Sequence, residues 1–145
     1  MTVSPTTRCE RFKEARGMMH VKQMINNHPN DFQLLRAAFG LLRNLSCVSP
    51  KQREFVAEKH EMIPVIMSAM KRHHTHPILC RNACSALSSL CAEPVYAWEV
   101  RFWLEELAAI SHHANNAFDW PRALQIAKRG GVKMAIMSLE VRFFL

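Results

Sequence analysis

The segment LLRAAFGLLRNL at residues 34–45 returns 45 residues later as LCRNACSALSSL at residues 79–90. In both segments, leucine and alanine recur at i, i+3/4 and i+7 spacing, which predicts the buried face of an amphipathic helix. Ala38 and Ala83 are expected to let neighbouring helices approach closely. These two segments are therefore predicted to be equivalent helices of a repeated unit.

The similarity extends beyond this helix. At a shift of 45 residues without a gap, residues 1–45 match residues 46–90 at ten positions. The matching pairs are Val3/Val48, Ser4/Ser49, Pro5/Pro50, Arg8/Arg53, His28/His73, Leu34/Leu79, Arg36/Arg81, Ala38/Ala83, Leu42/Leu87 and Leu45/Leu90. A period of roughly 40–47 residues is the size of two or three packed helices that stack on copies of themselves. The fold class predicted is all-α, a short helical solenoid.

Each unit opens with a Ser-Pro pair, in which serine caps a helix and proline occupies its first position. Three helices per unit are expected, with breaks at Gly17 and at Glu61-Met-Ile-Pro64. Repeat 1 spans residues 3–47 and repeat 2 spans 48–92. Their first two helices are predicted at residues 6–16 and 17–27, and at residues 51–60 and 61–72.

Residues 93–118 do not keep the period and are predicted to form an inserted or lengthened helix. Its apolar face comprises Val100, Trp103, Leu104, Leu107 and Ile110. Residues 119–145 then form a partial repeat 3. An ungapped third repeat is the alternative, but it places Gly130-Gly131 inside a helix at a cost of about 1 kcal/mol per glycine. The insertion is preferred, and residues 1–145 are treated as one domain.

Three segments resemble the armadillo repeat family: residues 61–70 (EMIPVIMSAM), 38–45 (AFGLLRNL) and 83–90 (ACSALSSL). They are similar to the family's second-helix pattern Gly-Ile-Pro-x-Leu-Val-x-Leu-Leu and its third-helix pattern Ala-x-Trp-x-Leu-x-Asn-Ile. The resemblance covers residues 3–92, and residues 126–137 resemble the end of a further first helix followed by a second helix. It implies a right-handed superhelix of three-helix repeats whose third helices line a concave groove.

The groove positions implied by this resemblance are Arg36, Gly40, Arg43 and Asn44 in one unit and Arg81, Ser85 and Ser89 in the next. In family members that bind extended peptides, an Asn and a Trp one turn apart line the groove. Here Asn44 occupies the Asn position of the first unit, whereas Ser89 occupies that position in the second unit. Both Trp positions hold non-aromatic residues. Recognition of basic localisation signals is therefore not expected. Arg36 and Arg81 can instead bind carboxylates, or they are solvated or paired with nearby glutamates.

The formal charge of +7 favours an acidic partner, either a protein segment or nucleic acid. The odd set of five cysteines, three of them within apolar helical pattern, favours reduced thiols in an intracellular compartment. The cytoplasm is the predicted location of the chain, and import into an organelle stays open as an alternative. No apolar run is long enough to span a bilayer, so no membrane association is expected.

No phosphate-binding loop, nucleophile motif or metalloprotease motif is present, so the chain is predicted to be no enzyme and to need no cofactor. No metal site is predicted either. A weaker alternative is a metal bound by His76, Cys80 and Cys84, which lie four residues apart. The aromatic residues Trp98, Phe102, Trp103, Phe118 and Trp120, beside Arg101, are interpreted as sealing the inserted helix against the repeats, with base stacking or a protein partner as alternatives.

The missing third helix of the last unit is expected to leave an exposed C-terminal interface at Met137, Phe143, Phe144 and Leu145. This surface favours a homo-oligomer or a larger complex. The overall prediction is a protein–protein interaction or scaffold module, a small subunit or adaptor that binds an extended, acidic partner in its groove. The alternative is a basic helical-repeat protein that binds nucleic acid.

Overall fold

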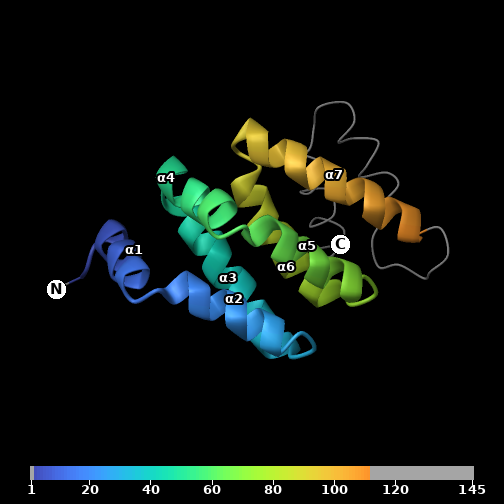
Figure 1. Cartoon of the computed structure of the whole chain (residues 1–145), viewed down its shortest axis with the longest axis horizontal. Coiled ribbons are helices and arrows are strands. Elements are labelled where there is room, and N and C mark those ends of the chain that lie inside the picture. Colours follow the sequence, from blue (N-terminus) through green and yellow to red (C-terminus); the bar gives the residue numbers. More distant parts are fainter. Residues whose placement is uncertain (1, 112–145) are drawn as a thin grey trace.

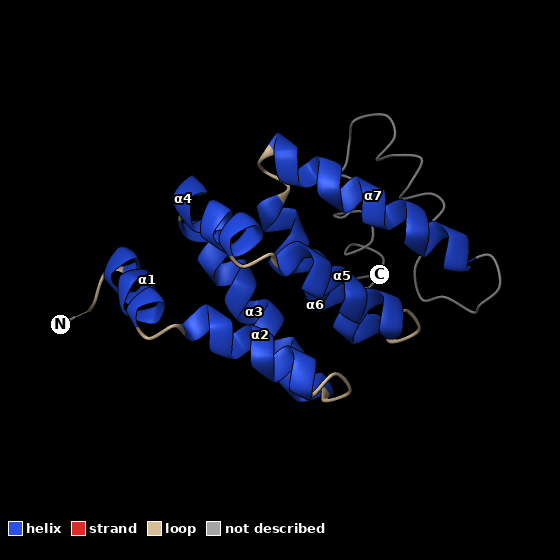
Figure 2. Cartoon of the chain, viewed as in Figure 1, coloured by secondary structure: helices blue, strands red, loops and turns tan. Residues whose placement is uncertain are grey.

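A computed structural model describes residues 2–111, with every side chain in that range except those of residues 104 and 106–111. This part of the chain is helical and contains no strand (Figures 1 and 2), so the all-α prediction is confirmed for it. The elements are α1 (Pro5–Glu14), α2 (Gly17–Asn27), α3 (Phe32–Val48), α4 (Pro50–Glu54), the π-helical segment η1 (Phe55–Lys59), α5 (Met62–Arg72), α6 (Pro77–Leu90) and α7 (Pro94–Ser111). The predicted partial repeat at residues 119–145 lies outside the described residues.

The two Ser-Pro pairs begin helices as predicted. The Ser4 hydroxyl accepts a hydrogen bond from the backbone N–H of Thr7 at 3.2 Å, and the Ser49 hydroxyl accepts one from Gln52 at 3.3 Å. Pro5 and Pro50 are the first residues of α1 and α4, where the absent N–H costs nothing. Both caps satisfy backbone donors that the helix itself leaves unpaired.

Both units bend sharply between their first two helices. Arg16, before α2, has φ 53°, and Glu61, before α5, has φ 50°; both are left-handed conformations, which non-glycine residues adopt at a cost. They are the non-glycine residues with positive φ within the described range, and they lie 45 positions apart. The bend therefore recurs at the period of the sequence, although the two residues that form it differ.

One helix departs from its prediction. Residues 51–60 were expected to form a single α-helix, but α4 ends at Glu54 and continues as the π-helical segment η1. A π-helical turn inserts one extra residue per turn into an α-helix. The side chains of Val56 and Ala57 on this turn are buried, so the extra residue accommodates core packing before the bend at Glu61.

The core is centred on α3 and α6. On α6, every residue of the predicted apolar face is buried: Leu79, Ala83, Ala86, Leu87 and Leu90. On α3, the predicted residues Leu35, Ala38, Leu42 and Leu45 are buried, while Leu34 and Leu41 are half-buried. Phe39, which the prediction left out, is fully buried. Complete burial of such a side chain contributes about 1.5–3 kcal/mol.

The α3 and α6 helices run in the same direction and form the most extensive helix–helix contact of the described residues. At their amino-terminal ends the Phe32 and His76 ring centroids lie 4.3 Å apart. At their carboxyl-terminal ends the Cys47 Sγ and Ser89 Oγ atoms lie 3.4 Å apart. Since α2 contacts both α3 and α5, and α5 contacts α6, the four helices form two layers, α2 with α5 and α3 with α6.

The α7 helix lies in the region predicted for an inserted helix and packs beside α5 (Figure 1). Val100 is buried and Trp103 packs against the core, as predicted, together with the buried Tyr96. The Tyr96 hydroxyl donates to Glu58 Oε1 at 3.1 Å, which ties α7 to η1. The side chains of Leu104, Leu107 and Ile110 lie outside the described part.

All five cysteines are free thiols, and Cys9, Cys80, Cys84 and Cys91 are buried among apolar side chains. For Cys80, Cys84 and Cys91 this matches their interpretation as small hydrophobic residues, and Cys9 is buried as well. None of the helices in residues 2–111 has both the length and the apolar character that crossing a membrane requires.

Candidate protein-binding surface

The structure places all seven predicted groove residues on two adjacent helices. We call this set the α3/α6 surface: Arg36, Gly40, Arg43 and Asn44 on α3, and Arg81, Ser85 and Ser89 on α6. Because the two helices are parallel and in contact along their length, the two rows run side by side. The predicted residues are thus brought together into one surface.

The α3 row is open. Arg36, Arg43 and Asn44 are exposed, and a Cβ atom built on Gly40 meets no atom within 4 Å beyond its chain neighbours and the adjacent backbone of α3. Neither arginine forms an ion pair with another group of residues 2–111. The space at Gly40 lies between two guanidinium groups without an ion pair in the described part of the chain, and it leaves room for a ligand to approach the helix backbone.

The α6 row is more enclosed. Arg81 is half-buried and already interacts within the chain. The Ser89 hydroxyl donates to the Ser85 carbonyl oxygen at 3.3 Å and contacts Cys47 Sγ. Arg36 and Arg81 are arginines at equivalent positions of the two units. Of these two side chains, only that of Arg36 is exposed.

The surface is positive because neither helix carries a carboxylate. The charged residues of α3 and α6 are Arg36, Arg43 and Arg81, and neither sequence contains Asp or Glu. Asp31 caps α3 from outside, where its carboxylate accepts the Leu34 backbone N–H at 3.1 Å. A guanidinium without a nearby carboxylate is available for bidentate binding of an external one.

The weak metal alternative has no geometric support. His76 Nδ1 accepts the Leu79 backbone N–H at 3.2 Å and thereby caps α6. The Cys80 thiol donates to the His73 carbonyl oxygen at 3.3 Å, and burial raises the pKa of Cys80 to about 12. Within residues 2–111, no three His, Cys, Asp or Glu side chains are grouped as metal ligands. The thiol therefore stays protonated and serves packing.

The aromatic residues of α7 do not all seal this helix against the core. Trp103 packs against the core, but Trp98 is 69% exposed and Phe102 is 61% exposed, which corrects the interpretation for these two. The Arg101 guanidinium lies 5.2 Å from the Trp98 ring centroid, within cation–π range. Phe118 and Trp120 lie outside the described residues, as do Met137, Phe143, Phe144 and Leu145 of the predicted C-terminal interface.

Two features of the molecular surface, both outside the α3/α6 surface, were not predicted from the sequence. Val95, 61% exposed, lies on the same outward face of α7 as Trp98 and Phe102. Their i, i+3, i+7 spacing is visible in the sequence beside the inward stripe. The second feature is a hollow between α2 and α5, bordered by Asn26 and Arg72. It has no signal in the sequence because its walls come from helices in different units.

Comparisons of the chain with protein-family models, with curated proteins and with solved structures found no match.

Proposed function

We propose that this chain is a short, basic, armadillo-like solenoid that acts as a non-enzymatic protein–protein interaction module. In this proposal the α3/α6 surface binds an extended, acidic segment of a protein partner, and the chain serves as an adaptor or small subunit of a larger assembly.

The solenoid arrangement is supported by the sequence separation of the long-range contacts. Side-chain hydrogen bonds that join distant parts of residues 2–111 link positions 38–44 apart: Lys22 to His60, Glu58 to Tyr96, Arg53 to Glu93, Cys47 to Ser89 and Pro29 to His73. In a solenoid each unit contacts mainly its neighbour, so contacts recur at about one repeat length. The left-handed bends at Arg16 and Glu61, 45 positions apart, follow the same period.

The observation that carries the binding proposal is the pair of exposed arginines on a carboxylate-free helix surface. Arg36 and Arg43 are two helical turns apart, a rise of about 10.5 Å along α3. In the extended polyproline II conformation, which has three residues per turn, carboxylates three residues apart lie on the same side of the chain and are separated by about 9 Å along its axis. An extended segment with an acidic residue at every third position can therefore engage both guanidinium groups, with Asn44 available for its backbone.

The test is fluorescence anisotropy with a labelled peptide of repeating Glu-Gly-Ser triplets and its matched Gln-Gly-Ser control. We expect Arg36→Glu/Arg43→Glu to weaken binding of the acidic peptide by at least about tenfold. The variant Arg11→Glu/Lys51→Glu makes the same change in net charge at exposed positions of α1 and α4 and should have little effect. Equal losses in the two variants would show that net charge, and not this surface, attracts the peptide.

A labelled single-stranded oligonucleotide in the same assay tests the nucleic-acid alternative. Nucleic-acid binding that neutralises several phosphates weakens steeply with salt because counterions are released. Tight, strongly salt-dependent oligonucleotide binding that is lost in Arg36→Glu/Arg43→Glu, with no binding of the acidic peptide, would overturn the proposal.

A further inference from the structure

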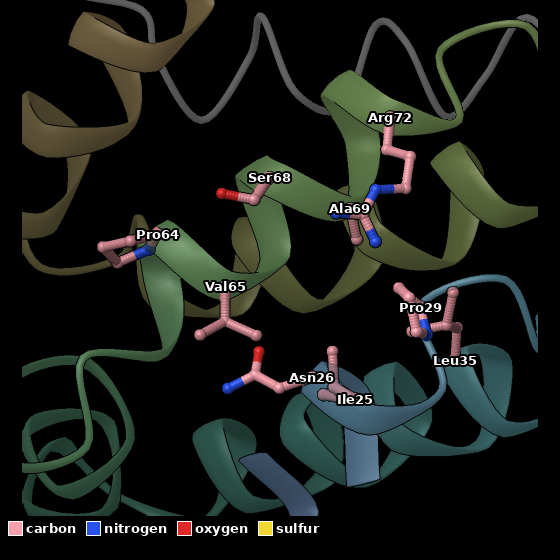
Figure 3. A pocket seen from close by; sticks show the side chains of 9 residues that line it. All are labelled: Ile25, Asn26, Pro29, Leu35, Pro64, Val65, Ser68, Ala69 and Arg72. Carbon is pink, nitrogen blue, oxygen red and sulfur yellow. The ribbon is translucent and has the colours of Figure 1, made fainter. Parts of the chain in front are cut away.

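A hollow of about 200 Å³ lies between α2 and α5, on the layer opposite to the α3/α6 surface (Figure 3). Its walls include apolar side chains that also belong to the core or pack against it: Ile25, Leu35, Val65 and Ala69. In Figure 3, Val65 of α5 and Asn26 of α2 point toward each other across the gap. The hollow thus gives an external group access to the half-buried Val65 side chain, while Ile25, Leu35 and Ala69 in its walls are themselves buried.

The residues at the rim of the hollow are polar, and two of them have no interaction partner within residues 2–111. Asn26, Ser68 and Arg72 are exposed, and the side chains of Asn26 and Arg72 pair with no other group of residues 2–111. The lining residues in the described part of the chain include no Asp or Glu. A guanidinium and a carboxamide with no partner among residues 2–111 therefore border a hollow that also has apolar walls.

We infer that this hollow is an anchoring pocket for one apolar side chain, such as leucine, with a carboxylate beside it in an acidic segment of a partner protein. The apolar side chain enters between α2 and α5, the Arg72 guanidinium binds the adjacent carboxylate, and the Asn26 carboxamide pairs with the backbone of the segment. This is a second site, and it does not depend on the α3/α6 surface.

The size and lining of the hollow favour this occupant over others. Pockets for small-molecule ligands and cofactors have volumes of about 300–1,000 Å³, so 200 Å³ suits a side chain better than a whole ligand. Within residues 2–111, the lining includes no aromatic ring on which a nucleic-acid base would stack. A single arginine fork beside an apolar cavity matches a carboxylate next to an apolar group.

The test uses the full chain with methyl labelling and three pentapeptides that differ in one feature. The acetylated, amidated peptide Glu-Glu-Leu-Glu-Glu is compared with Glu-Glu-Ala-Glu-Glu, which lacks the anchor, and with Gln-Gln-Leu-Gln-Gln, which lacks the charges. We expect the leucine peptide to shift the methyl resonances of Ile25 and Val65 and to bind about tenfold more tightly than the alanine peptide. The uncharged peptide should bind several-fold more weakly.

Two variants locate the site. Ser68→Phe places a ring at the exposed rim and should abolish the preference for leucine, while Arg72→Gln should abolish the preference for the charged peptide. Arg36→Glu/Arg43→Glu should leave the preference for leucine unchanged, which separates this site from the proposed function. Circular dichroism shows whether Ser68→Phe is folded. If it is not, the Arg72→Gln variant and the comparison of the three peptides with the unmodified chain still test the inference. Equal affinity for the leucine and alanine peptides, or methyl shifts confined to α3 and α6, would overturn the inference.

Discussion

At the bend between its first two helices, the first unit (α1–α3) has Phe12 and Gly17, whereas the second unit (α4, η1, α5 and α6) has Ala57 and Met62 at the equivalent positions. A Cβ atom on Gly17 would lie 2.1 Å from the Phe12 ring. In the second unit the small residue comes first, and both Ala57 and Met62 are buried. Each unit thus combines one large and one small side chain at the bend, in opposite order. The backbone bend recurs, while the order of the large and the small residue at the bend is reversed.

The largest difference between the units is expected in the core of the third helix. Phe39 of α3 is fully buried, and the equivalent residue of α6 is the buried Cys84. Phe39→Ala removes a whole ring and should lower the free energy of unfolding by about 3–5 kcal/mol, whereas Cys84→Ala should cost about 1 kcal/mol. Urea unfolding followed by circular dichroism measures both. Similar losses would mean that the second unit depends on Cys84 for more than its volume.

Arg8 and Arg53 are equivalent in sequence but differ in their contacts. The Arg53 side chain, 16% exposed, donates from Nε and Nη2 to Glu93 Oε1 at 3.1 and 3.0 Å, and from Nη1 to the Ser46 carbonyl oxygen at 3.1 Å. Arg8 is exposed, and its Nε donates to the Val3 carbonyl oxygen near the start of the chain.

Arg53→Ala should therefore lower the free energy of unfolding by about 2 kcal/mol, since Glu93 is 34% exposed and part of its charge stays solvated. Arg8→Ala should cost less than about 0.5 kcal/mol. Glu93→Gln in the same urea assay keeps an acceptor oxygen and should lose less than Arg53→Ala. An equal effect of Arg8→Ala and Arg53→Ala would refute the link between Arg53 and the start of α7.

Parts of the two units were predictable because their signals are local. Ser4 and Ser49 cap the helices that follow them because a serine hydroxyl reaches a backbone N–H three residues later in any sequence context. The predicted helix at residues 17–27 coincides with α2, since Gly17 marks its start. The apolar faces of α3 and α6 follow from helical periodicity alone.

Other parts depend on packing between distant residues and left no local signal. Arg16 and Glu61 have no intrinsic preference for positive φ, so their bends come from the packing of the helices on either side. Arg36 and Arg81 are indistinguishable in the repeat, and their different exposure depends on the neighbouring helices. The candidate α3/α6 surface could be predicted as a set of residues, but its division into an open and an enclosed row could not.

The opposite order of residues at the two bends predicts a strong coupling. Gly17→Ala gains helix propensity of up to about 1 kcal/mol, but its Cβ collides with the Phe12 ring, at a cost of about 1–3 kcal/mol. The net effect should be a loss of about 1 kcal/mol in the free energy of unfolding.

In a Phe12→Ala background the collision is absent, so Gly17→Ala should stabilise instead. A double-mutant cycle in urea measures this coupling. Additive effects of the two substitutions would contradict the idea that the ring and the glycine are matched to each other.

The smallest expected difference concerns pH and His60, whose equivalent in the first unit is the non-ionisable Ala15. Burial, followed by the charges of Lys59 and Lys22, lowers the pKa of His60 below its usual 6.5. Between the lowered pKa and 6.5 the unfolded chain binds more protons, so stability is present above pH 6.5 and declines as the pH falls. His60→Ala, which copies the first unit, should reduce the loss of stability between about pH 7.5 and 5.5 in urea unfolding. Lys22→Gln should reduce it less, because burial, the largest cause of the shift, remains. If His60→Ala left the pH dependence unchanged, protonation of His60 would not be the cause of the acid sensitivity.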